Sequence, residues 1–165
     1  MEYQTSAAME EIKIIVLRLD SEEYGVDVSQ VRSIERMHSI TRVPSTPDFV
    51  EGVINLRGEV IPIINLRARM GIPVLDRTEE TRIVIVGIGD TEMGLIVDSA
   101  NDVIDISVKE IQAPPPVLAN IEAKYIRGIA KLDDRLLILL DMEKVLNSKD
   151  TEIIKKIGST NNGSD

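Results

Sequence analysis

At 165 residues, the chain is long enough for one domain or two small subdomains. Its 43% hydrophobic residues can form a core without disulfide or metal cross-links. It has no cysteine, which excludes disulfides and thiolate metal sites, and only 2% aromatic residues, so isoleucine, valine and leucine must fill the core. The formal net charge of −9 argues against sequence-independent nucleic-acid binding and against an anionic membrane surface.

The N-terminal region predicts a tail and then a pair of strands. Residues 1–11 carry three glutamates and lack the regions of a signal peptide, so we expect a flexible tail. Apolar runs stay far below the roughly 20 residues of a membrane span, so we expect no membrane insertion. Residues 12–19 and 24–28 predict strands around a polar turn. Residues 29–36 fit a strand or a helical turn; in a helix, Val31 and Ile34 would face the same side.

A stretch at residues 49–67 predicts a β-hairpin, around which the rest of the chain is arranged. Its two apolar, β-branched strands flank Arg57 and Gly58, and the glycine supplies the positive φ that a tight turn needs. The turn presents a single arginine. Asn65 is placed to cap a short helix that extends through Met70.

The second half of the chain predicts more short strands and one helix. Ser107 and Glu110 fit a capping box, which predicts a helical turn. We expect a C-terminal helix over residues 142–157 and a disordered tail over 158–165. Short strands with frequent turn signals favour small barrels or a sandwich. The expected strands cover residues 82–88, 93–97, 103–106, 125–132 and 135–141.

The second half also echoes the first. A shift of 76 positions aligns an aromatic residue, a glycine, the hairpin aliphatics and the helix cap. The echo continues upstream with a smaller shift, which matches residues 25–28 with 94–98, and Val31 and Ile34 with Val103 and Ile106. Such a repeat predicts two similar β-subdomains across a groove or a shared core. The hairpin pairs are Phe49 with Tyr125, Gly52 with Gly128, Leu56 with Leu132, Ile61 with Leu137, Ile63 with Leu139 and Asn65 with Asp141.

Residues suited to catalysis are scarce. The single histidine, His38, lies in a polar stretch before a proline loop and fits a solvated side chain. No nucleophile elbow or phosphate-binding glycine loop occurs. Asp133 and Asp134 replace Arg57 and Gly58 in the repeat, and adjacent turn carboxylates point apart, so a solvated turn fits them better than glycoside chemistry. The pattern therefore favours a binding protein over an enzyme.

Three side chains have open interpretations from the residues alone. Val31 and Ile34 fit either the core or a surface for a partner. Arg57 can be solvated, tied to a nearby carboxylate, or able to bind a partner with its guanidinium fork.

Residues 51–67 resemble the signature of the chemotaxis coupling family CheW, and segments at 24–28, 94–98 and 136–141 match in the same order. The resemblance covers roughly residues 12–147. It implies two SH3-like, five-stranded β-barrels packed together as one CheW-like domain, followed by the C-terminal helix. It also implies a non-enzymatic cytoplasmic adaptor that joins the tips of methyl-accepting chemoreceptors to the regulatory domain of the histidine kinase CheA, in membrane-bound receptor arrays. No cofactor, metal, small-molecule substrate or nucleic acid is implied.

The same resemblance assigns binding residues by position. A segment at residues 112–117 matches the region where the family meets the kinase, which assigns Gln112 and Val117. Many members carry a glutamate where this chain has Ser33, and Glu35 is expected to point elsewhere. Some members carry arginine at the position of Gln112. The receptor-facing residues are Val28, Val31, Ile34, Gly52, Arg57 and Val103.

Two other functions remain open at this point. A small hydrolase or sugar-binding β-domain would need carboxylates gathered in a pocket. A CheW-like scaffold in a pathway other than chemotaxis would have the same sequence features.

Overall fold

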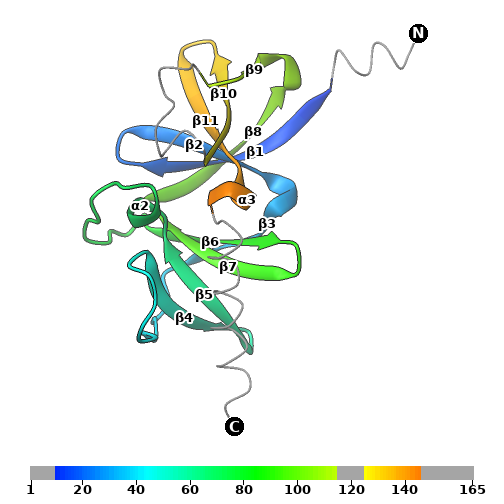
Figure 1. The fold of residues 1–165 in the computed structure, drawn as a ribbon. Coiled ribbons are helices and arrows are strands. Elements are labelled where there is room, and N and C mark those ends of the chain that lie inside the picture. The colour runs from blue at the N-terminus through cyan, green and yellow to red at the C-terminus, as the bar shows by residue number, and fades with distance from the viewer. Residues whose placement is uncertain (1–9, 115–124, 146–165) are drawn as a thin grey trace.

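A computed structural model describes residues 10–114 and 125–145, which form a mainly β protein with two sheets, as the sequence predicts. Figure 1 shows one sheet in the upper half of the molecule and the other in the lower half, with α2 and α3 between them. The strands are β1 (Glu11–Leu19), β2 (Glu22–Asp27), β3 (Val31–Arg36), β4 (Val50–Leu56), β5 (Glu59–Asn65), β6 (Arg82–Ile88), β7 (Thr91–Val97), β8 (Ser99–Ser107), β9 (Ile111–Gln112), β10 (Ile126–Leu132) and β11 (Arg135–Leu140). The helical elements are η1 (Val28–Gln30), α2 (Leu66–Arg69), η2 (Val108–Glu110) and α3 (Met142–Val145).

Local signals in the sequence account for several of these elements. Asn65 caps α2 through its side chain, which accepts a hydrogen bond from the Ala68 amide. Ser107 and Glu110 form the predicted capping box at η2. The predicted helix 142–157 begins where α3 begins. Its part beyond Val145, the tail 158–165 and residues 1–9 lie outside the described residues.

Both sheets combine strands from the two halves of the chain. The first sheet has the order β8-β1-β2-β11-β10-β9, and the second has the order β3-β6-β7-β5-β4. The first therefore has six strands where five were expected, because the short β9 adds to its edge. In neither sheet does the first strand of the order pair with the last, so among the described residues neither sheet forms a closed, hydrogen-bonded barrel. The sheets interleave along the sequence, which the repeat alone did not predict.

A single segment nevertheless reaches both edges of each sheet. In the second sheet, the chain beyond β3 crosses to the far edge, where Thr41 pairs with Val53 on β4. In the first sheet, β8 continues through η2 into β9, where Gln112 pairs with Ile129 on β10. Each sheet is therefore rolled, and its edges are joined through the chain.

The two hairpins that the sequence aligns have matching ladders. Val50 pairs with Ile64 before a bulge at residue 51, and Ile126 pairs with Leu140 before a bulge at residue 127. All four paired residues are related by the shift of 76 positions that aligns the sequence. The hairpins are thus equivalent in register as well as in composition.

The core forms three main apolar layers, because the central strands bury both faces. A shared core lies between the sheets and includes Leu17, Val84 and Leu95. One cluster fills the roll of the second sheet, around Ile63. Another fills the roll of the first sheet, around Leu137. Isoleucine, leucine and valine dominate all three layers, as the low aromatic content requires.

A buried ion cluster joins the two sheets. Arg67, at the start of α2, is 8% exposed and donates to Asp98 at 2.8 and 2.6 Å and to Asp20 at 2.5 Å. A further hydrogen bond runs from Arg67 to the Pro73 carbonyl at 2.7 Å. Asp20 lies in the β1–β2 turn of the first sheet, and Asp98 lies where β7 of the second sheet passes to β8 of the first. The hydrogen bond from Arg67 lowers the pKa of Asp98, against the opposing effect of partial burial.

A second link lies beside α2. The Arg69 guanidinium stands 4.7 Å from the ring centre of Phe49 and 4.9 Å from that of Tyr125, and these two rings are partners in the repeat. Its Nε donates to the Val145 carbonyl at 2.6 Å, at the end of α3. One side chain therefore contacts both halves of the repeat.

We expect Arg67→Ala to lower the free energy of unfolding by about 3 to 5 kcal/mol, because Asp98 and Asp20 would lose a buried cationic partner. Arg77→Ala is the matched control. It removes an arginine that pairs with Glu51 at 3.2 Å and is 45% exposed, and it should cost less than about 1 kcal/mol. Urea unfolding measures both. Equal losses from the two variants would show that the cluster does not join the sheets.

Candidate interaction surface

The edge strand β3 carries two of the predicted receptor-facing residues on one face. Val31 lies opposite Val86 and Ile34 lies opposite Val84, and both of these β6 residues belong to the shared core. Residues three apart on a regular strand would face opposite sides, but a bulge at Arg32 inserts one residue and restores the match. Of the two conformations left open by the sequence, the strand is correct, and it still places both side chains on the same face.

These apolar side chains differ in how much of them is open to solvent. Val28 and Val31 are half-buried and pack against the shared core. Ile34 is 38% exposed. On the edge strand of the other sheet, Val103 is 57% exposed and lies opposite Ile15, which is also a shared-core residue. Each sheet therefore leaves one apolar side chain open on its edge strand, beside the shared core.

The ladders also correct the upstream part of the repeat. Gly25 lies opposite Val16, and Gly94 lies opposite Ile85, so these two positions are equivalent. The same spacing makes Ile34 the equivalent of Val103. The match of Val31 with Val103 that the sequence predicts is wrong by three residues, because the shift of 69 positions holds through both edge strands, and β8 has a bulge where β3 has one.

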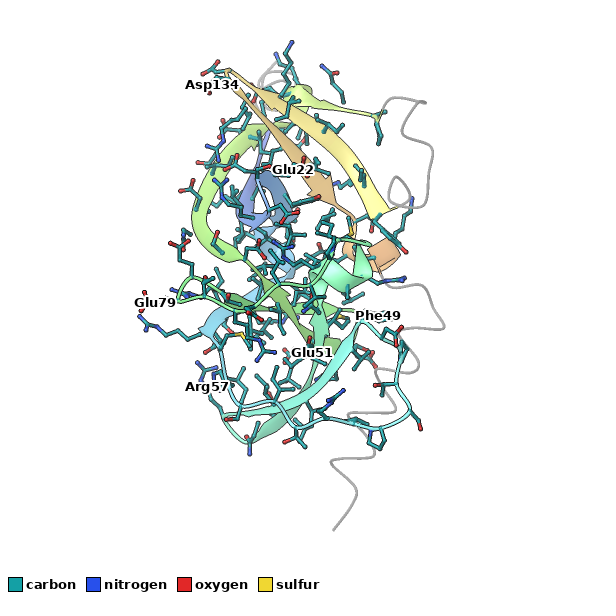
Figure 2. All side chains as sticks on the ribbon, turned by 90° about the vertical axis from the view of Figure 1, so that its left-hand side faces the viewer. Glu22, Phe49, Glu51, Arg57, Glu79 and Asp134 are labelled. Atoms are coloured by element: carbon teal, nitrogen blue, oxygen red, sulfur yellow. The ribbon has the colours of Figure 1, made fainter. Side chains whose placement is uncertain are left out.

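The hairpin turn holds Arg57 in an uncommon backbone conformation. Arg57 has φ 51° and Gly58 has φ 89°, and the Gly58 amide donates to the Asn55 side chain at 2.9 Å. The Arg57 side chain is 72% exposed, and its Nη2 stands 3.3 Å from Oε2 of Glu35. Figure 2 shows Arg57 beside the second sheet and Asp134, in the matching turn, at the far end of the first.

The prediction that the Glu35 side chain points away from Ser33 is wrong. Glu35 shares a face of β3 with Ser33, because residues two apart on a strand do. A hydrogen bond with the Ser33 side chain lowers the pKa of Glu35 most, partial burial opposes this, and the Arg57 charge lowers it further. Ser33, Glu35 and Arg57 therefore form one polar chain from the edge strand to the hairpin turn. Period-two alternation along β3 was the signal that could have found it.

The remaining predicted residues lie elsewhere. Gly52 is buried at φ 145°, and a Cβ there would collide with the Thr41 carbonyl oxygen, so it shapes β4 and presents no side chain. Gln112 is exposed in β9, on the far edge of the first sheet from β8. Val117 lies outside the described residues. Binding roles for these three residues stay predictions.

An open cavity of about 550 Å³ lies beside the buried Arg67. Its charged lining is largely paired within the protein, as in Arg67 with Asp98 at 2.6 Å and Arg77 with Glu51 at 3.2 Å. Within residues 10–114 and 125–145, no group of three or more His, Cys, Asp or Glu residues is placed to hold a metal ion. In the same part of the chain, no helix is long and apolar enough to cross a membrane.

These features define a mainly β protein of two interleaved sheets, with open apolar positions on its edge strands. A family model described as a CheW-like domain matches residues 13–150. The chain belongs to the CheW family.

Several similar proteins are named CheW. The chain is 41% identical over 140 residues to the chemotaxis protein CheW of Bacillus subtilis, which covers 85% of this chain and 90% of the relative. It is 32% identical over 148 residues to the chemotaxis protein CheW of Klebsiella aerogenes, covering 90% and 89%. The crystal structure of the scaffolding protein TtCheW from Thermoanaerobacter tengcongensis matches with a TM-score of 0.76 and 40% identity, covering 84% of this chain and 90% of that one.

The polar chain predicts a measurable titration. We expect the pKa of Glu35 to lie below that of an ordinary glutamate, and to rise in both Ser33→Ala and Arg57→Ala, because each removes a group that favours the carboxylate. The contact then contributes stability above the ordinary pKa of about 4.3, and this is lost as the pH falls through the folded-state pKa. Carboxyl NMR titration of Glu35 in the unaltered protein and in the two variants measures this. An unchanged Glu35 pKa in both variants would show that Ser33 and Arg57 do not contact the Glu35 carboxylate.

Proposed function

We propose that this protein is a non-enzymatic adaptor that couples methyl-accepting chemoreceptors to the histidine kinase CheA in bacterial chemotaxis. Membership of the CheW family is the observation that carries the proposal. Relatives over most of the chain are named chemotaxis proteins, and a solved neighbour is named a scaffolding protein. The adaptor acts in the cytoplasm and joins receptor arrays at the membrane. Each rolled sheet serves as an SH3-like barrel.

The receptor tip binds across the edge strands β3 and β8. Ile34 and Val103 supply open apolar surface, and half-buried Val28 and Val31 give it a firm base on the shared core. A helical tip with an apolar stripe removes this surface from water, which favours binding by about 25 cal/mol per Å² of apolar area. Equivalent positions on two edge strands suit a partner that touches both sheets at once.

Arg57 serves receptor control of the kinase and does not stabilise the fold. Its side chain is mostly exposed, and an exposed pair such as that with Glu35 contributes little to folding. The positive φ of the turn and the carboxylate of Glu35 together restrict where the guanidinium points. The chain uses this arginine once, since the equivalent turn residue is Asp133.

The kinase binds near Gln112, which lies on β9 at an edge of the first sheet, and near Val117. In the strand order, β9 and β8 are the two outer strands of this sheet. Receptor and kinase therefore use different edges of one body. Two modest contacts on one rigid body strengthen each other through effective concentration.

The receptor surface is tested by Val103→Glu. We expect about tenfold or greater loss of affinity for a receptor-tip fragment, because a carboxylate would have to leave water on binding. Leu136→Glu is the matched control, since Leu136 is 62% exposed on β11. Calorimetry measures binding, and thermal unfolding checks that both variants fold. Equal affinity of the two variants would place the receptor elsewhere.

The signalling role of Arg57 is tested in a reconstituted array of receptor, kinase and adaptor. We expect Arg57→Ala to reduce receptor control of CheA autophosphorylation while changing the free energy of unfolding by less than about 1 kcal/mol. Glu35→Gln should reproduce part of the defect, because it releases Arg57 without removing it. Lys109→Ala serves as an exposed control on η2. Normal kinase control by Arg57→Ala would remove Arg57 from the mechanism.

A further inference from the structure

Two arginines lie directly opposite one another at the end of the edge strand. Arg36 on β3 pairs in register with Arg82 on β6. Like charges in directly opposite positions of an antiparallel ladder destabilise the sheet. The chain as a whole is acidic, with a net charge of −9, so this local excess of positive charge runs against its average.

Neither guanidinium is neutralised within the described residues. Arg82 is half-buried and is held by hydrogen bonds from Nη1 to the carbonyls of Glu79 and Thr81, at 2.8 and 2.9 Å. Carbonyls fix its position but carry no net charge. Arg36 is exposed, and across residues 10–114 and 125–145 it has no carboxylate within ion-pair distance. Arg82 is thus a fixed donor, and Arg36 is a free one beside it.

The equivalent place in the first sheet provides an internal comparison. The spacing that relates Ile34 to Val103 relates Arg36 to Asp105 and Arg82 to Lys13. There the base lies opposite an acid, and Lys13 pairs with Asp105 at 2.9 Å. The fold therefore accommodates an internal ion pair at this position, and the second sheet has two arginines in its place.

The two arginines adjoin the open apolar side chain of the same strand. Ile34 and Arg36 are two residues apart, so they share a face, about 6.6 Å apart along the strand. Side chains one turn apart on a helix are separated by about 5 to 6 Å. A partner helix can therefore place one apolar and one charged residue on this pair at the same time.

We propose that Arg36 and Arg82 together receive a carboxylate from a partner helix, one turn away from an apolar side chain that packs on Ile34. The inference rests on the proposed function and names the chemistry that the receptor tip presents to the second sheet. Guanidinium groups suit this role, because their planar donors match the two oxygens of a carboxylate. The partner charge removes the repulsion between the arginines, so binding and relief of the like-charge contact are coupled.

The test uses Arg36→Asp in the full chain with a receptor-tip fragment. This change recreates the Lys13–Asp105 arrangement, so we expect the melting temperature to stay level or rise, while affinity for the tip falls about tenfold. The salt dependence of tip binding should flatten as well, because a charge contact is lost. Lys131→Asp, with the same change of charge on exposed β10, should leave the affinity within about twofold. Arg36→Lys should bind more tightly than Arg36→Asp but less tightly than the unaltered protein, because it keeps the charge and loses the planar donors.

The outcomes separate this inference from the proposed function. Failure of the unaltered protein to bind the tip overturns both. Binding by the unaltered protein with equal affinities for Arg36→Asp and Lys131→Asp overturns the inference alone. In a complementary arm, the acidic residues of the tip are changed one at a time to lysine. One of them should restore binding to Arg36→Asp, and restoration by none would also overturn it.

Discussion

The buried contact of Arg67 with Asp98 and Asp20 is the constraint on which the arrangement of the two sheets depends. The chain passes between the sheets at η1 and at the β7–β8 connection, and this cluster lies at the second crossing, where it joins α2 to the β1–β2 turn. A guanidinium that is 8% exposed must be fully partnered, since an unpaired buried charge is far more costly than the pair is favourable. Its partners come from different sheets, so correct pairing of the charge requires correct placement of the sheets. The cluster therefore specifies the fold as well as supporting it.

Because the two sheets are held in place relative to each other, the side chains on their edge strands form a defined surface. The shared core fills the space between the sheets, and β3 and β8 border it with one open apolar side chain each. Arginine–carboxylate contacts also connect each hairpin to its sheet: Arg57 reaches Glu35 on β3, and Arg135 reaches Glu23 on β2 at 2.9 Å. A surface supported in this way can bind a partner with little reorganisation.

Much of this structure was accessible from the sequence, for physical reasons that can be named. Short β-branched runs and turn residues identified the strands, and Asn65 and Ser107 marked two helix starts through capping. The interleaving of the sheets was not accessible, because strand periodicity reports which face is buried and not which strand is the neighbour. The repeat counterpart of Val103 was predicted wrongly, because aliphatic residues of short strands align at more than one shift, whereas the ladders keep a shift of 69 through both edge strands. The orientation of Glu35 was accessible in principle, because residues two apart on a strand share a face and this places Glu35 beside Ser33. The burial of Arg67 was not accessible, because a sequence does not distinguish a buried arginine from an exposed one.

Differences within the repeat carry more information than its similarities. Matched glycines, aromatics and aliphatics maintain two equivalent ladders, and they account for architecture. At several equivalent positions the charge changes sign, and it does so in both directions: Arg57 stands against Asp133 and Arg36 against Asp105, whereas Glu59 stands against Arg135. Surface charges are weakly constrained by folding, so the fold itself does not require these differences. The two scaffolds therefore differ in their pattern of charges and not in its overall sign. A body with two equivalent scaffolds and different charge patterns on them can bind two unlike partners without confusing them, because a charge that suits one partner opposes the other at the wrong site.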